Sequence, residues 1–400
     1  MNTLLSAGII FTLLAIVFCL YRWGNVKCIG VTPVKTFTFI AILFTSGLDV
    51  GLIMFPLTEF AGYGDLATSP EYGFSNPLAI EFAYWGFLIW GFYFLTSFYF
   101  CVIEPKVGFF QIPLIKWINN VVIIGTCAFT AYLLLTNLPW YLPELTEQGS
   151  IVTTFYVIVF AVIIAAVFSS TDIKYVRILS LASTWLFLAL IAVMWFLAAM
   201  GPNEMLDAAN LIGNYFVNIH KFVLPLNDYH EFYLFWWFAW SIMIGQFTAR
   251  FVGGLRTWQV LAALLIFPSI PLGIWFSVLF FYHENGLDSA GFVGISMVVV
   301  GITFVINSLD SLIRLYSDNM NLTAERVGRV KYIIGNLVAL SALTMLFKLN
   351  FLEIQWVGAL VIMLYFSCFA YIILKKRKEV LSITSSPEDR VLDFNKTKSA

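Results

Sequence analysis

Aromatic side chains at helical spacing are the residues of this sequence best suited to recognise a ligand. Two groups qualify: Trp85, Trp90 and Tyr93 in one apolar segment, and Trp236, Trp237 and Trp240 in another. At about 100° per residue, each group places at least two rings on one helix face. Ring faces attract a quaternary ammonium ion, which cannot donate hydrogen bonds, by about 0.5–2 kcal/mol each when desolvated. The spacing therefore indicates an aromatic cage, with a belt of interfacial or lipid-facing tryptophans as the alternative.

A carboxylate inside an apolar segment is the second candidate for chemistry. Asp49 lies between Gly47 and Gly51, and a charge near the bilayer centre costs about 2.5–3.5 kcal/mol on insertion scales. Such a residue could carry a proton or provide one oxygen ligand of a sodium ion. It could also be structural, by capping the free amides of a broken helix or by pairing with Lys174 or Arg177. All three interpretations stay open.

The composition places these residues in a membrane. The chain has 400 residues, of which 60% are hydrophobic and 11% charged, and its mean hydropathy is +0.88; the apolar share of a water-soluble domain is lower. A hydrocarbon core about 30 Å thick needs about 20 apolar residues per helix, which predicts about eleven spans. They are expected at about 4–22, 36–58, 80–103, 117–138, 151–170, 176–200, 231–251, 258–281, 291–315, 331–349 and 354–374. The stretch 203–224 is amphipathic and is expected at the membrane surface.

Charged residues are sorted between the two sides of these spans. Lysines and arginines in the connections fall on one face of the membrane, with Lys221 and Lys348 as exceptions, and the acidic loops around Asp65, Glu144 and Asp288 fall on the other. The positive-inside rule then predicts an N-terminus outside the cell and a C-terminal tail in the cytoplasm.

The number of spans indicates an internal repeat. Without the first span ten remain, and five plus five is the arithmetic of an inverted repeat, in which the substrate lies near the midplane and the first helix of each half is broken. Gly47, Gly51 and Pro56 favour such a break in the first half, and Gly245 is expected to give one in the second. The predicted divisions are a first span with a cytoplasmic loop, the first repeat, an interfacial helix, the second repeat and a cytoplasmic tail, at 1–34, 35–200, 201–230, 231–374 and 375–400.

Other classes of function find little support in the sequence. The five cysteines and three histidines have no metal-ligand or redox spacing, and no basic stripe for nucleic acid is present. No nucleophile–base pair lies in an apolar segment, so an enzyme is not expected, and no continuous polar stripe indicates a channel. The first apolar run lacks the basic start and the cleavage site of a signal peptide, so it is interpreted as a retained span.

Four motifs, in order along most of the chain, resemble the betaine/carnitine/choline transporter family. They are 46–51 with Glu59, similar to the family's glycine-rich broken helix; 85–93, similar to its first aromatic segment; 232–256, similar to its signature segment; and 304–311, similar to the span that supplies its sodium ligands. Four ordered motifs are much more specific than any single one.

This resemblance implies an all-α membrane protein with a five-plus-five inverted-repeat (LeuT-like) core and one extra N-terminal span, usually trimeric and surrounded by lipid. It would lie in the plasma membrane, which is the inner membrane of a bacterium, and import betaine, choline, carnitine or a related solute by secondary active transport. It would need no cofactor and no metal site, only a proton or a sodium ion as coupling ion. The implied substrate-binding residues are Trp85, Trp90, Tyr93, Trp236, Trp237, Trp240 and Met54. The implied ion-coupling residues are Gly47, Asp49, Asn307 and Ser308.

The chain also departs from the family pattern. Leu234 replaces a tryptophan of the signature, Met54 an aromatic residue and Asn307 a hydroxyl ligand, so the solute stays open within its class. A membrane sensor that binds the same solutes without moving them, or an ion-independent antiporter, would have the same cage. Asp310 is interpreted as structural.

Cytoplasmic anchoring is the simplest interpretation of three arginines at the ends of spans. They are Arg250, Arg256 and Arg314.

Overall fold

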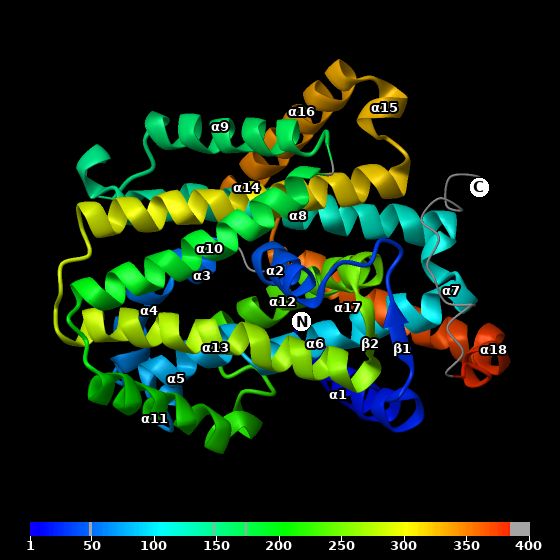
Figure 1. Ribbon diagram of the computed structural model, residues 1–400, viewed down its shortest axis with the longest axis horizontal. Coiled ribbons are helices and arrows are strands. Elements are labelled where there is room, and N and C mark those ends of the chain that lie inside the picture. Colours follow the sequence, from blue (N-terminus) through cyan, green and yellow to red (C-terminus); the bar gives the residue numbers. More distant parts are fainter. Residues whose placement is uncertain (48–49, 147–148, 173, 385–400) are drawn as a thin grey trace.

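The computed structural model describes residues 1–47, 50–146, 149–172 and 174–384, which form helices and one small sheet (Figure 1). The longer helices are α1 (Asn2–Trp23), α2 (Thr36–Gly47), α6 (Leu88–Phe98), α8 (Pro113–Tyr141), α9 (Thr153–Ser169), α10 (Lys174–Leu197), α11 (Pro202–Asn218), α12 (Asp228–Phe251), α13 (Thr257–Glu284), α14 (Phe292–Met320), α16 (Arg329–Lys348) and α17 (Ile354–Tyr371). The shorter ones are α3 (Val50–Met54), α4 (Pro56–Gly64), α5 (Pro77–Trp85), α7 (Glu104–Val107), α15 (Ala324–Val327) and α18 (Arg377–Leu381). Asp49, predicted to couple an ion, lies outside the described residues.

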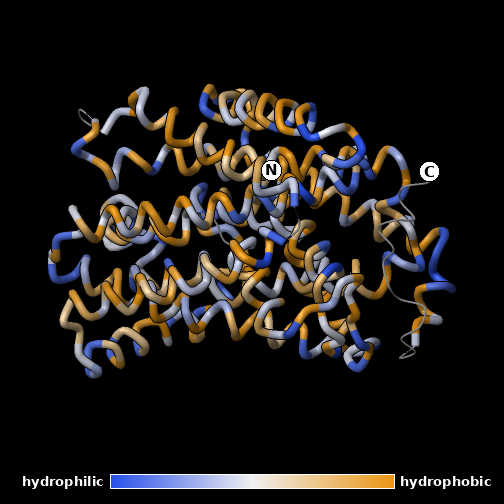
Figure 2. The backbone as a smooth tube through the Cα atoms, turned by 45° about the horizontal axis from the view of Figure 1, so that its top comes forward, coloured by the Kyte–Doolittle hydropathy of each residue, from blue (hydrophilic) through white to orange (hydrophobic). Residues whose placement is uncertain are grey.

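The helices have the length and composition of membrane spans. In the described part of the chain, 8 helical segments are long and apolar enough to cross a membrane, and α2 and α9 are shorter apolar helices. Every predicted span overlaps one of these segments or α12; the second, 36–58, is covered in the described residues by α2, α3 and the start of α4. Figure 2 shows hydrophobic residues along the helices and hydrophilic residues mainly near their ends. The all-helical, multi-pass class is confirmed, and the number of spans stays a prediction.

Helix α12 is the central element of the bundle. Every residue from Tyr233 to Phe251 is buried, and the helix packs against α2, α6, α8 and α17. A helix that is apolar on all sides is expected in the interior, because it has no polar face to turn outward. The side chains of the signature segment therefore point into protein on all sides of α12.

The expected break at Gly245 is wrong, because α12 runs without interruption from Asp228 to Phe251. A Cβ atom on Gly245 would lie 2.7 Å from the backbone of Thr96 in α6. The glycine therefore serves close approach of two helices, which needs a missing side chain and no unwinding.

A break occurs instead in the predicted third span, which is divided into α5 and α6. Phe87, between the two helices, has a φ of +37°. Its N–H group donates to Ser269 Oγ of α13 at 3.0 Å, and the N–H group of Leu88 donates to the hydroxyl of Tyr215 at 3.2 Å. These hydroxyls satisfy amides that a helix start leaves without a partner. Tyr215 belongs to α11, the amphipathic helix predicted between the sixth and seventh spans.

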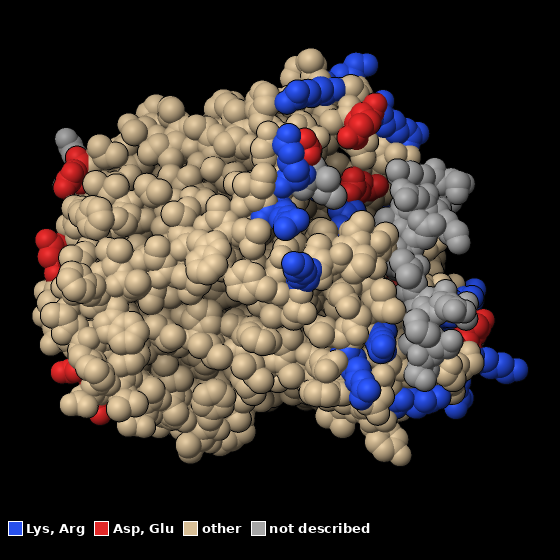
Figure 3. Space-filling view, in the orientation of Figure 1, with Lys and Arg blue, Asp and Glu red and all other residues tan. Residues whose placement is uncertain are grey.

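The two ends of the molecule differ in charge. Strands β1 (Lys27–Ile29) and β2 (Gly253–Arg256), which were not predicted, pair antiparallel and tie the connection after α1 to the connection after α12. On the face shown in Figure 3, lysines and arginines gather toward the end that carries these strands and α18, and the opposite end shows acidic residues only. This separation matches the sorting of charges expected from the sequence.

Candidate functional site

Three indole rings from two helices meet inside the bundle. The ring of Trp85, the last residue of α5, lies edge-on to Trp236 at 5.5 Å and to Trp237 at 5.0 Å between centroids. Trp236 and Trp237 of α12 stack with 5.0 Å between centroids and 9° between planes. All three are at most 1% exposed, which does not fit a belt of interfacial tryptophans. We call these three residues the tryptophan cluster.

The other predicted aromatic residues lie at different distances from this cluster. Tyr93 is 6.2 Å from Trp237, and Trp90 is 5.3 Å from Tyr93. Trp240 is fully buried, but the ring contacts found among the described residues do not join it to the cluster. The structure thus links five of the six predicted rings in one chain of contacts.

Phe55 contacts the tryptophan cluster at the position where the sequence suggested Met54. Its ring lies 6.1 Å from both Trp85 and Trp236. Met54 is buried, and its carbonyl oxygen accepts a hydrogen bond from the Tyr141 hydroxyl. The sequence could have indicated Phe55, because this aromatic residue directly follows Met54, which stands where the family pattern has an aromatic residue.

Gly51, Phe129 and Tyr233 complete the surroundings of the cluster. A Cβ atom on Gly51 would lie 2.5 Å from the Trp85 ring and 3.1 Å from the Trp236 ring, so only glycine lets α3 approach this closely. Tyr233 is 5.6 Å from both rings, and Phe129 of α8 is 5.8 Å from Trp236. Neither residue was predicted to line the site, although Tyr233 lies one helical turn before Trp236 and Trp237 of α12.

Indole N–H groups hold the interrupted segments next to the cluster. Trp237 Nε1 donates to the carbonyl of Tyr84 at 2.8 Å, and Trp275 Nε1 of α13 donates to the carbonyl of Leu52 at 2.9 Å. Both acceptors lie near the ends of short helices, where carbonyls lack the intrahelical partner. Trp237 therefore supplies a ring face to the cluster and also positions the end of α5.

Other buried indoles, in the cluster and beyond it, have no acceptor. Within the described part of the chain, the N–H groups of Trp90, Trp236 and Trp240 find no hydrogen-bond partner. A buried donor without a partner costs about 1–3 kcal/mol. Such donors are therefore available to a ligand that brings an acceptor.

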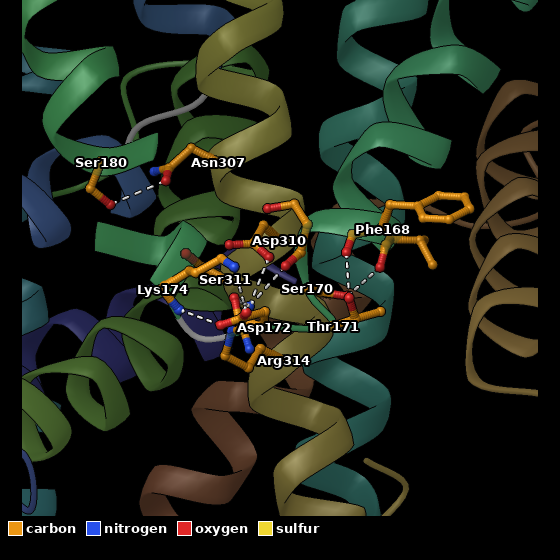
Figure 4. Close-up of polar contacts among 12 residues, drawn as sticks. Phe168, Ser170, Thr171, Asp172, Lys174, Ser180, Asn307, Asp310, Ser311 and Arg314 are labelled. Carbon is orange, nitrogen blue, oxygen red and sulfur yellow. Dashed lines mark hydrogen bonds and ion pairs between the residues drawn. The ribbon is translucent and has the colours of Figure 1, made fainter. Parts of the chain in front are cut away.

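The predicted ion-coupling residues of α14 bond to the end of α2. Asn307 Nδ2 donates to the carbonyl and hydroxyl oxygens of Thr45, both at 3.0 Å, and Asn307 Oδ1 accepts from Ser180 Oγ at 3.1 Å (Figure 4). Ser308 Oγ donates to the same Thr45 carbonyl at 3.4 Å. A carbonyl only accepts, so the amide nitrogen faces the helix end and the amide oxygen points away from it.

Gly47, the last residue of α2, packs closely against side chains of α12 and α6. A Cβ atom there would lie 2.6 Å from Ile244 and 3.5 Å from the Trp90 ring. The end of α2 is therefore held between α14 and the predicted aromatic residues.

Asp310 pairs with the arginine one turn away. Arg314 Nη2 lies 3.2 Å from Asp310 Oδ1 and also donates to the carbonyls of Ser169 and Asp172, at 3.2 and 2.9 Å (Figure 4). These contacts tie α14 to the end of α9, which supports the structural interpretation of Asp310. Arg250 likewise pairs with Asp318 at 2.7 Å.

A cavity with a carboxylate lies beside the tryptophan cluster. It has a volume of about 530 Å³ and is lined by, among others, Phe55, Thr58, Glu59, Tyr63 and Tyr229; we call it the vestibule. Glu59 of α4 accepts hydrogen bonds from Tyr63 at 2.6 Å, from Tyr233 at 3.0 and 3.1 Å, and from Tyr229. Phe55 and Tyr233 therefore separate the vestibule from the cluster.

Comparison with known proteins agrees with this architecture. The chain is 23% identical over 317 residues to glycine betaine transporter 1 of Vibrio parahaemolyticus, covering 68% of this chain and 59% of that protein. It is 24% identical over 282 residues to glycine betaine transporter OpuD of Bacillus subtilis, covering 60% and 54%. It is 24% identical over 287 residues to a glycine betaine/proline/choline/ectoine transporter of V. parahaemolyticus, covering 61% and 50%. No protein-family model matches the chain.

The apolar helices and the buried tryptophan cluster define a multi-pass helical membrane protein whose relatives are transporters and not enzymes. The chain is a distant homologue of the glycine betaine transporters of the betaine/carnitine/choline transporter family. The matches span between half and three fifths of the length of these relatives.

Proposed function

We propose that this protein is a secondary active transporter that imports a quaternary ammonium or related compatible solute of the betaine, choline or carnitine type. The observation that carries the proposal is the meeting of Trp85, Trp236 and Trp237 deep in the bundle, with Phe55 beside them. A methylated nitrogen among these rings would be attracted by their faces, without a directional hydrogen bond.

The unpaired donors support solutes that also carry an acceptor. Trp90, Trp236 and Trp240 have indole N–H groups without a partner among the described residues. A carboxylate or hydroxyl oxygen on the solute would satisfy such donors and recover the cost of burying them. Betaine and carnitine bring a carboxylate and choline a hydroxyl, so all three suit the site.

Transport explains the arrangement better than sensing does. The vestibule is lined by Phe55 and Glu59, and Phe55 together with Tyr233, which bonds to Glu59, forms a layer of side chains in contact with the tryptophan cluster. A layer of this kind is what an alternating-access mechanism opens and closes around a central site. The transporter names of the relatives favour the same conclusion.

Purified protein in proteoliposomes tests the proposal. We expect accumulation of labelled betaine, choline or carnitine above the outside concentration when an ion gradient is imposed, and slower accumulation at low solute concentration when Trp237 is replaced by leucine. Binding of a solute without any accumulation would identify a sensor. Exchange of internal for external solute without any need for a gradient would identify the ion-independent antiporter.

The proposal also covers the membrane, the oligomeric state and the coupling ion of the transporter. The apolar helices and the bacterial relatives support a place in the plasma membrane, with lipid around the bundle, and the resemblance supports a homotrimer. The candidate coupling ions are a proton and a sodium ion, and no cofactor or metal is needed.

A further inference from the structure

Two glutamates without a role in the proposed solute binding lie side by side at the vestibule. Glu59 of α4 and Glu81 of α5 have carboxyl groups within hydrogen-bonding reach of each other. Glu59 is half-buried and lines the vestibule, whereas Glu81 is fully buried behind it. The two residues are far apart in sequence, so their meeting depends on how α4 packs against α5.

Glu81 is a buried acid without a donor. Neither of its carboxyl oxygens meets a donor in good hydrogen-bond geometry among the described residues, while Tyr63, Tyr229 and Tyr233 all donate to Glu59. Two carboxylates side by side both lack a donor proton, and a hydrogen bond between them forms only when one of them is protonated. Two neighbouring carboxyl groups, one of them fully buried and without a donor, therefore favour a proton on the pair.

In the part of the chain that the structure describes, no cation is paired with either glutamate. The titratable groups close to the pair are tyrosines: Tyr63, Tyr72, Tyr84, Tyr141, Tyr229 and Tyr233. Two histidines lie further out, His230 stacked on Tyr84 and His283 against Phe60. Like-charged carboxylates this close cannot both stay ionised in a buried site.

We propose that Glu59 and Glu81 form a site for one shared proton, taken up from the vestibule, and that this proton is the ion coupled to solute movement. A hydronium ion in the vestibule gives a proton to a carboxylate oxygen of Glu59, which lines that cavity, and is left as water; the proton is then shared with Glu81. The claim that this proton is coupled to solute movement rests on the proposed transport function.

The pair is placed to communicate with the tryptophan cluster. The Tyr233 hydroxyl donates to Glu59, and the ring of the same residue lies 5.6 Å from both Trp85 and Trp236. Glu81 lies one helical turn before Trp85 on α5. Loss of the proton would leave two negative charges, which repel each other and separate α4 from α5. Because Phe55 immediately precedes α4, this movement would open the layer over the cluster.

Glu81→Gln tests the proposal in proteoliposomes. Glutamine keeps the size of the side chain and removes its ability to bind and release a proton. We expect solute binding, followed by tryptophan fluorescence, and solute exchange to persist, and the stimulation of uptake by an inward proton gradient to disappear. Glu59→Gln should give the same result, so the test survives if one variant does not fold. Glu144→Gln, an exposed acid at the same end of the molecule, should retain the full stimulation.

Uptake by Glu81→Gln and Glu59→Gln that still responds fully to the proton gradient would overturn the proposal. An infrared pH titration without solute separates it from the proposed function. We expect the wild type to show the carbonyl band of a buried protonated carboxyl group and Glu81→Gln to lack it. If the wild type binds no solute but shows this band, the proposed function and the coupling fail while the proton site stands. If the band is absent from the wild type, the proton site fails by itself.

Discussion

Trp237 combines two roles in one side chain, because its ring stacks on Trp236 and its N–H group holds the carbonyl of Tyr84. Trp237→Leu removes one ring face, which is worth about 0.5–2 kcal/mol to a bound cation and so lowers solute affinity about 2- to 30-fold. Fluorescence titration with betaine and choline measures the loss.

Two further variants separate the roles of Trp237. Trp237→Phe keeps a ring face and removes only the N–H group, so we expect a smaller loss of affinity than with leucine. Trp185→Leu changes a tryptophan of α10 that is 60% exposed and should leave affinity unchanged. Equal affinities of wild type and Trp237→Leu would place the binding site elsewhere.

The orientation of the Asn307 amide leads to a prediction for how transport responds to sodium. Its amide nitrogen, and not its oxygen, faces the Thr45 carbonyl at the end of α2, so a sodium ion would meet a donor where it needs an oxygen ligand. We expect the initial rate of solute uptake to stay the same when potassium replaces all sodium at constant pH. A rate that falls when sodium is removed would contradict this prediction and show that sodium takes part in uptake.

Single residues were predictable from the sequence only where a local pattern marks them. The rings of Trp85, Trp236 and Trp237 follow helical spacing, and the structure brings them together. Glu59 and Glu81 have no such pattern, because each looks like an ordinary acid near a helix start and only the packing of α4 on α5 unites them.

At the scale of elements, Gly245 sets the distance between α12 and α6. A Cβ atom there would lie 2.7 Å from Thr96, so Gly245→Ala forces the two helices apart at a cost of about 1–3 kcal/mol. We expect a lower midpoint of thermal unfolding in detergent. Gly335→Ala in α16, where nothing lies within 4 Å, is the matched control and should be neutral or slightly stabilising. An unchanged midpoint in Gly245→Ala would mean that the contact is looser than described.

The break between α5 and α6 depends on side chains from other helices. Ser269→Ala removes the hydroxyl that accepts from Phe87 N–H, and the half-buried amide then loses a bond worth about 0.5–1.5 kcal/mol. Thermal unfolding should begin at a lower temperature. Ser296→Ala removes an exposed hydroxyl that bonds only within α14 and should unfold as the wild type does; a matching decrease in both variants would contradict the capping role.

These two elements explain why helix breaks were only partly predicted. A glycine in an apolar segment indicates either unwinding or close packing, and the sequence of α12 does not distinguish them. The break at Phe87 has no glycine–proline pattern comparable to the one around Gly51, because the groups that stabilise it come from α11 and α13. Long-range contacts of this kind cannot be inferred from local spacing.

The features of the whole molecule were the easiest to predict from the sequence, because hydropathy and charge are averaged over many residues. The predicted spans overlap helices, and on the face in Figure 3 basic residues gather toward one end while the other end shows acidic residues only. The small sheet of β1 and β2 escaped prediction since it pairs two short segments more than 200 residues apart. Such a pairing leaves no periodic signal in either segment.

The direction of the bundle in the membrane follows from this charge separation and can be measured with introduced cysteines. The five native cysteines are buried, so labelling by a membrane-impermeant maleimide in intact cells should report exposed additions only. We expect Asn2→Cys and Asp288→Cys to be labelled from outside, and Ser382→Cys to be labelled only after the membrane is opened. Labelling of residues 2 and 382 from the same side would require an even number of spans. α2, α9 and α12, which fall outside the segments long and apolar enough to span by themselves, would then be the first to re-examine.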